Sequence, residues 1–144
     1  MLERILIIAA LLAIASAGYW WWQRRQGRVR EVHRDGALSS EMLGAKRGYR
    51  ATFVQFSTPM CAKCPGTARL LTDVAEGHRQ VVHLEIDASE RLDLARELSI
   101  MRTPTTLVLD GDGMVVARMD GPPTREQAEA ALATVPPSRP DYSI

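Results

Sequence analysis

The stretch ATFVQFSTPMCAKC, residues 51–64, carries a strand signal that leads directly into two cysteines. Its first six residues are mostly β-branched or aromatic, which is typical of a β-strand. From Cys61 to about Glu76 the apolar side chains recur at helical spacing, so a helix is expected there. Cys61 and Cys64 are therefore predicted to lie where a strand gives way to a helix.

This placement favours redox chemistry at the cysteine pair. A cysteine reacts as its thiolate, and the unpaired N–H groups and dipole at the amino end of a helix stabilise a negative charge. Cys61, at the first position of the expected helix, is therefore predicted to be the nucleophile, and Lys63 adds positive charge beside it. Cys64, one turn further in and more buried, is predicted to form a disulfide with Cys61 and to resolve mixed disulfides.

Two other interpretations of the cysteine pair stay open. A C-x-x-C pair is also half of a zinc or metal-carrier site, but the candidate histidines His33, His78 and His83 show no paired ligand spacing. The other interpretation is that both cysteines are inert residues of the core. We expect no metal and no cofactor. The formal net charge of +1 gives no sign of nucleic-acid binding, and two cysteines do not suffice for a disulfide-stapled secreted fold.

The rest of the chain alternates strand and helix signals. Before residue 51, a short strand is expected within residues 28–32 and a helical turn after Ser39. The later elements are expected in this order: a strand over 81–86, a helix capped by Ser89, a strand over 105–109, a turn at 110–113, a strand over 114–119 and a helix from Thr124 to about Thr134. This order predicts an α/β fold whose central mixed sheet has helices on both faces.

From about Tyr49 to Thr134 the sequence resembles the thioredoxin family. Three features carry the resemblance: the strand FVQF running into STPMCAKC, the segment LEID at residues 84–87, and RTPT at residues 102–105. The resemblance implies a thioredoxin-like fold and thiol–disulfide oxidoreductase activity. It also implies that Pro104 follows a cis peptide bond and faces the cysteines, and that Thr103 offers backbone N–H and C=O groups to a bound peptide.

The chain departs from the family around the cysteines. Met60 replaces the usual tryptophan, and Ala62 and Lys63 replace the usual Gly-Pro between the cysteines. Gln55 stands where the family has a buried acid that assists proton transfer to the resolving cysteine, and an amide is not a base. His83 is a candidate substitute proton carrier, the alternative being a structural or surface histidine. These departures argue against a general-purpose reductase and leave open a membrane-tethered binding or scaffolding module without efficient turnover.

Residues 5–22 read ILIIAALLAIASAGYWWW and contain no charge. Eighteen such residues are enough to cross the hydrocarbon core of a bilayer as a helix, and the aromatic cluster at residues 19–22 suits the headgroup boundary. We therefore predict a single-pass membrane anchor. The alternatives are a cleavable signal peptide, with its cleavage site near Ala15-Ser16-Ala17, and a buried core helix.

The charges that flank this apolar segment predict its orientation. Four arginines follow it within residues 24–30 and only Arg4 precedes it, and positive flanks tend to stay cytoplasmic. The domain is therefore expected to face the cytoplasm from the cell membrane, with an extracytoplasmic domain as the alternative. We divide the chain into a transmembrane anchor (1–23), a juxtamembrane linker (24–46), a thioredoxin-like domain (47–135) and a flexible tail (136–144).

The anchor and the resemblance together predict the partners. The arrangement is similar to bacterial membrane-anchored thioredoxin-like proteins with a short arginine-rich stalk. We expect disulfide-containing proteins or low-molecular-weight thiols near the membrane as substrates. An electron donor is expected as well, such as a thioredoxin-reductase-like enzyme or a membrane thiol carrier, together with membrane lipid but no nucleic acid.

Overall fold

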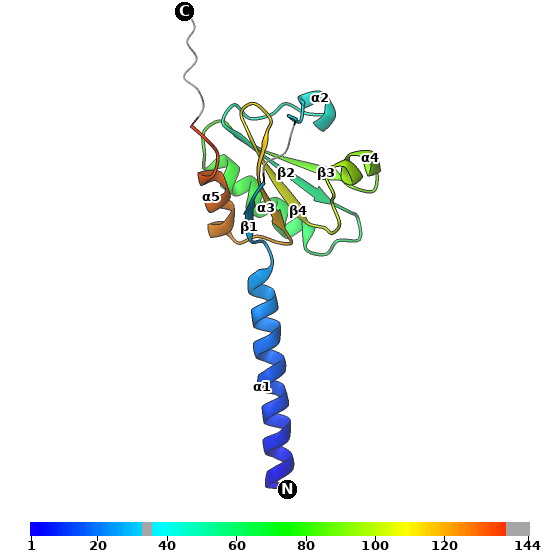
Figure 1. The fold of residues 1–144 in the computed structure, drawn as a ribbon, viewed down its shortest axis with the longest axis vertical. Coiled ribbons are helices and arrows are strands. Elements are labelled where there is room, and N and C mark those ends of the chain that lie inside the picture. The colour runs from blue at the N-terminus through cyan, green and yellow to red at the C-terminus, as the bar shows by residue number, and fades with distance from the viewer. Residues whose placement is uncertain (33–35, 138–144) are drawn as a thin grey trace, which may run out of the picture.

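A computed structural model describes residues 1–32 and 36–137 of the 144-residue chain. A long helix projects from a rounded domain that holds the strands (Figure 1). The elements are, in chain order, α1 (Leu2–Arg25), β1 (Val29–Glu31), α2 (Ser40–Leu43), β2 (Ala51–Ser57), α3 (Cys64–Glu76), β3 (Val81–Asp87), α4 (Leu92–Glu97), β4 (Thr105–Asp110), β5 (Val115–Asp120) and α5 (Arg125–Ala133). The candidate metal ligand His33 and residues 138–144 of the predicted tail lie outside the described residues.

The five strands form one mixed sheet in the order β1-β5-β4-β2-β3. β2 and β3 are parallel and are connected through α3, whereas the other neighbours pair antiparallel. The predicted mixed sheet is confirmed, as is the short strand near residue 30, which pairs with β5 at the sheet edge. The β4–β5 hairpin turns where predicted, because the Asp110 carboxylate accepts the N–H groups of Asp112 and Met114.

Side chains alternate along β2, so that both faces of the sheet are covered. On one face Phe53 belongs to an apolar cluster with Leu71 of α3 and Leu132 of α5. On the other face Val54 belongs to a second cluster, with Leu94 of α4. All seven residues of β2 are buried. This interior strand therefore leads from the core of the domain directly into the segment that carries the two cysteines.

The helix that was expected to be capped by Ser89 begins later than predicted. α4 starts at Leu92, and Ser89 does not cap it. Instead, the Asp87 carboxylate at the end of β3 accepts hydrogen bonds from the N–H and the hydroxyl of Ser89, so the chain turns before the helix starts. The predicted cap at Thr124 is confirmed, because its hydroxyl accepts the Gln127 N–H while the Gln127 side chain accepts the Thr124 N–H.

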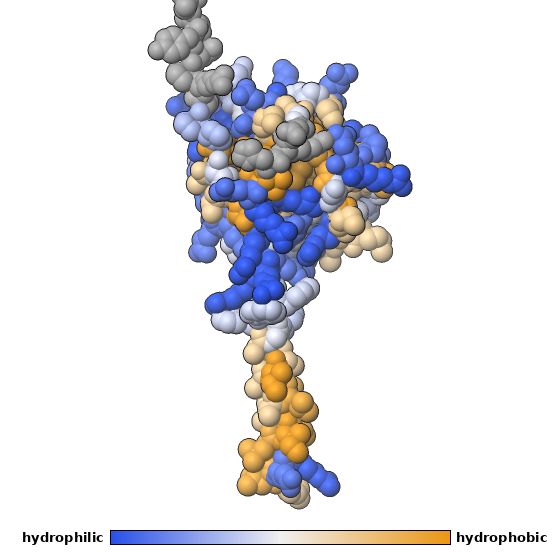
Figure 2. Space-filling model, in the orientation of Figure 1, coloured by the Kyte–Doolittle hydropathy of each residue, from blue (hydrophilic) through white to orange (hydrophobic). Residues whose placement is uncertain are grey.

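α1 is the one helix among the described residues that is long and apolar enough to cross a membrane. None of its residues is buried, and its apolar side chains form a hydrophobic stalk (Figure 2). Hydrophilic residues gather where this stalk meets the domain. α1 therefore has the length and composition of the predicted membrane anchor.

The carboxyl end of α1 is bonded directly to the domain. The Gly27 N–H donates to the Asp120 carbonyl at 2.8 Å, and the Gln127 amide donates to the Gln26 carbonyl at 3.4 Å. Gly27 has a φ of +69°, and a Cβ at this position would lie 2.7 Å from Gln127 Oε1, so only glycine fits. Residues 27–31, part of the segment predicted as a linker, are thereby held against the domain.

Candidate active site

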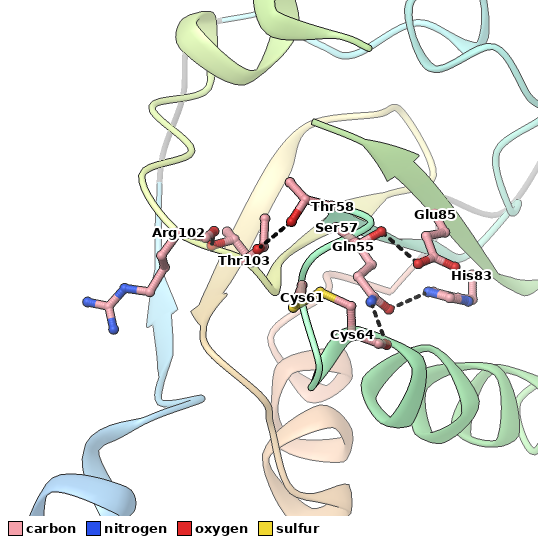
Figure 3. The surroundings of a disulfide bond; sticks show 10 residues. Gln55, Ser57, Thr58, Cys61, Cys64, His83, Glu85, Arg102 and Thr103 are labelled. Carbon is pink, nitrogen blue, oxygen red and sulfur yellow. Dashed lines mark hydrogen bonds between the residues drawn. A yellow bond between two sulfur atoms is a disulfide. The ribbon is translucent and has the colours of Figure 1, made fainter. Parts of the chain in front are cut away.

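A disulfide joins Cys61 and Cys64 at the junction of β2 and α3, with their Cα atoms 5.5 Å apart (Figure 3). The two cysteines differ in exposure. Cys64 has 2% of its surface exposed, whereas Cys61 is half-buried. The predicted pairing is therefore present, and the accessible member of the pair is Cys61.

Cys61 does not occupy the first position of α3, contrary to the prediction. α3 starts at Cys64, and residues 61–63 form a turn in which the Cys64 N–H donates to the Cys61 carbonyl. Pro65 explains the difference, because it has no N–H with which to extend the helical hydrogen bonds back to Cys61. The Cys61 sulfur still lies at the amino end of α3, since it is bonded to the sulfur of the first helical residue.

We call the surroundings of Cys61 the open side, and they comprise Thr58, Lys63 and Thr103. The Cys61 N–H donates to the Thr58 carbonyl at 3.0 Å, and the Thr58 hydroxyl lies 3.4 Å from the Thr103 hydroxyl. The peptide bond between Thr103 and Pro104 is cis, as the resemblance implies. Thr58 thereby connects the cysteine turn to the segment that carries the cis proline (Figure 3).

Lys63 is exposed and reaches the carboxyl end of α1. Its Nζ lies 5.9 Å from the ring centroid of Trp22, within the range of a cation–π contact. Lys63 also lines a cleft whose other wall includes Trp20. The turn that carries the cysteines therefore lies beside the aromatic end of the apolar helix.

Cys64 lies against a network of uncharged polar groups that we call the closed side, which comprises Gln55, His83 and Thr72. The side chain of Gln55 is fully buried, and its Nε2 donates to the Cys64 carbonyl at 3.1 Å. Its Oε1 lies 3.1 Å from His83 Nε2, and the Thr72 hydroxyl lies 3.0 Å from His83 Nδ1. The network therefore runs from the cysteine turn across β2 and β3 and back to α3.

The hydrogen bonds of Gln55 determine which nitrogen of His83 carries a proton. Because the amide nitrogen donates to a carbonyl, the amide oxygen must accept, and His83 Nε2 must therefore be the donor. In the neutral ring Nδ1 is then an acceptor, and it accepts from the Thr72 hydroxyl. The basic nitrogen of His83 faces Thr72 and not Cys64. This geometry favours the structural interpretation of His83 over the proton-carrier interpretation.

Burial lowers the pKa of His83 below its usual value of 6.5, and the nearby Glu85 carboxylate opposes part of that shift. Glu85 in turn accepts a hydrogen bond from the Ser57 hydroxyl at 2.6 Å. His83 is therefore neutral at physiological pH, and the groups that bond to it and to the Cys64 carbonyl are neutral as well.

Thr58 and Thr72 take part in the site without having been predicted from the sequence. Neither residue belongs to a recognisable motif, and their roles follow from the turn before Cys61 and from the packing of α3 on β3. Of the predicted residues, Gln55 is bonded to the Cys64 carbonyl, and Thr103 contacts Thr58, whose carbonyl accepts the Cys61 N–H. Within residues 1–32 and 36–137, no three histidine, cysteine, aspartate or glutamate side chains gather as a metal site would require.

Comparison with known proteins places this site in a family context. The family model described as a thioredoxin-like domain matches residues 39–136. The thioredoxin of Methanocaldococcus jannaschii is 35% identical over 78 residues, which cover 54% of this chain and 86% of that protein. The TPR repeat-containing thioredoxin TDX of Arabidopsis thaliana is 27% identical over 95 residues, which cover 66% of this chain but only 25% of that longer protein.

Solved structures agree with the sequence comparisons. The long form of thioredoxin F from spinach chloroplast superposes with a TM-score of 0.54 at 26% identity, covering 66% of this chain and 78% of that chain. Thioredoxin NaTrxh from Nicotiana alata gives a TM-score of 0.53 at 23% identity, covering 61% of this chain and 76% of its own, and supports the fold alone. The predicted resemblance and fold class are confirmed.

Proposed function

Because the chain belongs to the thioredoxin-like domain family, we propose that it exchanges disulfides at a membrane surface, with Cys61 as its nucleophile. The chain is a thiol–disulfide oxidoreductase. The proposed role of Cys61 is supported by the asymmetry of the disulfide, which joins a half-buried Cys61 to a buried Cys64 at the start of a helix.

The proposed reaction has two steps. In the reduced protein, the Cys61 thiolate attacks one sulfur of a substrate disulfide, and the other substrate sulfur leaves as a thiolate. The Cys64 thiol then loses its proton to solvent and attacks the Cys61 sulfur, which releases the second substrate thiolate and forms the Cys61–Cys64 disulfide. Two electrons pass from the protein to the substrate. An electron donor, a reductase or a membrane thiol carrier, restores the dithiol.

The open side supplies the contact with substrate in this proposal. Thr103 is partly exposed beside the cysteine turn, and its backbone is the candidate edge for an extended peptide. Lys63 contributes positive charge close to the thiolate of Cys61. The role of the closed side is to hold the Cys64 backbone in place through Gln55.

The membrane location rests on α1 and on the place of Lys63. We propose that α1 is a single-pass anchor in the cell membrane, with the aromatic residues 19–22 at the headgroup boundary. The contact between Lys63 and Trp22 then puts the cysteine turn close to the bilayer surface. Substrates whose disulfides lie near that surface are favoured, because tethering raises their effective concentration. The arginines after α1 favour a cytoplasmic domain.

Trapping tests the assignment of the two cysteines. The full chain with Cys64→Ser should accumulate mixed disulfides on Cys61, whereas Cys61→Ser should accumulate none. Turnover of a soluble disulfide should fall by at least about a thousandfold in both variants. A Cys64→Ser protein that captures nothing, while wild type turns over, would contradict the proposed mechanism. A wild-type protein that has a measurable reduction potential but no turnover would favour the binding-module alternative.

Reconstitution tests the membrane location. Wild type in lipid nanodiscs should reduce a disulfide peptide anchored in the same bilayer by an acyl chain at least about tenfold faster than the same peptide in solution. Equal rates would argue against action at the membrane surface. In intact cells, an impermeant thiol reagent should leave both cysteines unlabelled, and ready labelling would reverse the proposed orientation.

A further inference from the structure

A cleft of about 630 Å³ lies between the carboxyl end of α1 and the underside of the domain. Its walls come from both parts of the chain: Trp20, Gln23 and Arg24 from α1, and Lys63, Thr124 and Glu126 from the domain. This volume lies in the range of small-molecule sites, which is about 300–1,000 Å³.

The cleft carries a net positive charge, because Arg24 and Lys63 outnumber Glu126. The Arg24 guanidinium lies over the Trp20 ring, with its Cζ 3.3 Å from the ring centroid, the distance of a cation–π contact. Stacking uses the face of a guanidinium and leaves its N–H groups, which lie in the plane, available to bind phosphate oxygens. Lys63, from the domain, supplies a second cation to the same cleft. Two cations in one cleft favour an anionic ligand such as a phosphate group.

The position of the cleft along the membrane normal, relative to the tryptophans, indicates where such a phosphate would come from. From Trp22 to Gln26 an α-helix rises about 6 Å. The polar layer on each side of a bilayer is about 5–7 Å thick. If Trp20 and Trp22 lie at the hydrocarbon boundary, the cleft lies within the headgroup layer, where lipid phosphates are the abundant anions.

We propose that this cleft binds the headgroup of an anionic phospholipid, with the phosphate held between Arg24 and Lys63. The inference rests on the proposed membrane anchoring of α1. Lys63, which lies between the two cysteines in sequence, would then have two roles: it contributes positive charge near the Cys61 thiolate and it binds the lipid phosphate. Glu126 and Thr124 face the part of the headgroup beyond the phosphate, where hydroxyl groups of a glycerol headgroup can donate to the Glu126 carboxylate.

Native mass spectrometry of the full chain tests the proposal, with phosphatidylglycerol, phosphatidylethanolamine or phosphatidylcholine as the probe lipids. Wild type should retain phosphatidylglycerol in preference to the other two lipids. Lys63→Gln and Arg24→Gln should each weaken that retention about fivefold, the effect expected for one basic residue at an anionic surface. Lys46→Gln is the matched control. Lys46 is the other lysine of the chain and follows α2, which lies at the far end of the domain from α1 (Figure 1).

Several results would overturn the proposal. Equal retention of the three lipids, stronger retention of phosphatidylethanolamine, or an equal loss in Lys46→Gln would each exclude an anionic headgroup site at Lys63. Displacement of the lipid by millimolar inorganic phosphate would show a site for free anions instead. Disulfide capture by the full-length Cys64→Ser protein is measured in parallel with its lipid retention. A protein that captures disulfides but shows no lipid preference therefore loses this proposal and keeps the redox mechanism.

Discussion

The two sides of the Cys61–Cys64 disulfide are built differently. On the open side Cys61 is half-buried and donates its N–H to the Thr58 carbonyl, and Thr58 in turn contacts Thr103 beside the cis proline. On the closed side Cys64 is buried against the Gln55 amide, which His83 and Thr72 hold in place. In the proposed mechanism the open side admits the substrate, and the closed side positions the second cysteine.

The difference teaches that a redox pair can keep its geometry after losing the usual acid. Gln55 occupies the position of that acid and is still bonded to the cysteine turn. An amide donates a hydrogen bond but takes no proton, so the closed side orients Cys64 without deprotonating it. We therefore expect the second step of the reaction to depend on solvent as the base.

Truncation of the Gln55 side chain on the closed side should give the largest effect, a loss of stability. Gln55→Ala should lower the free energy of unfolding by about 2–4 kcal/mol, because it leaves a cavity, removes one hydrogen bond to the Cys64 carbonyl and leaves the His83 N–H without its acceptor. Thr58→Ala on the open side should cost less than about 1 kcal/mol. Urea denaturation measures both values, and Gln55→Met, which fills the space, separates the hydrogen bonds from the cavity. Equal costs on the two sides would remove the contrast.

Restoring an acid on the closed side should change the kinetics. Gln55→Asp places a carboxylate near Cys64 and should accelerate the resolving step at least about tenfold, the lower range of general-base catalysis. Stopped-flow measurement of mixed-disulfide decay isolates this step. The first step, attack by Cys61, should stay within about twofold of wild type, since the open side is unchanged. A Gln55→Asp protein with an unaltered resolving rate would show that solvent is an adequate base.

The closed side should also make stability depend on pH. His83 has a pKa below 6.5 in the folded protein, so the folded state favours the neutral ring more than the unfolded state does. Its contribution to stability is complete above about pH 6.5 and is lost as the pH falls through the lowered folded pKa. The free energy of unfolding should therefore decrease from pH 7 to pH 5, and less so in His83→Gln. Parallel pH profiles for the two proteins would contradict this assignment.

The smallest effect is expected for the charge on the open side. Lys63→Gln should slow alkylation of reduced Cys61 about twofold to threefold at low salt, because an exposed charge acts weakly through water. The difference should shrink at high salt. Lys46→Gln should leave the rate unchanged. A salt-independent loss would mean that Lys63 acts through packing and not through its charge.

The fold and the open side were largely predictable from the sequence. Their signals are local in the sequence. The β-branched and aromatic run at 51–56 forms β2, the cysteine pair follows it, and Pro104 follows a cis peptide bond just before β4. The helix was predicted to start at Cys61 from the helical spacing of its apolar residues, but α3 starts at Cys64 because Pro65 has no N–H to donate to the Cys61 carbonyl. Ser89 was mispredicted as a cap because the competing acceptor, Asp87, lies on the preceding strand.

The closed side was less accessible to prediction. Gln55 and His83 stand out as departures from the family, but their bond depends on the register of β2 against β3. The partnership of Thr72 with His83 depends on how α3 packs over that sheet, which no sequence motif encodes. The cleft between α1 and the domain likewise depends on contacts between residues about a hundred positions apart, such as the bond from Gln127 to the Gln26 carbonyl.

The most direct test is brief alkylation of the reduced full chain with limiting iodoacetamide, followed by peptide mass spectrometry to locate the modified cysteine. We predict that Cys61 is modified first and that Cys64 reacts only after unfolding, because one sulfur is accessible at the amino end of α3 and the other is buried. Modification of Cys64 first, or of both cysteines at equal rates, would contradict the division between an open nucleophile and a closed resolving cysteine.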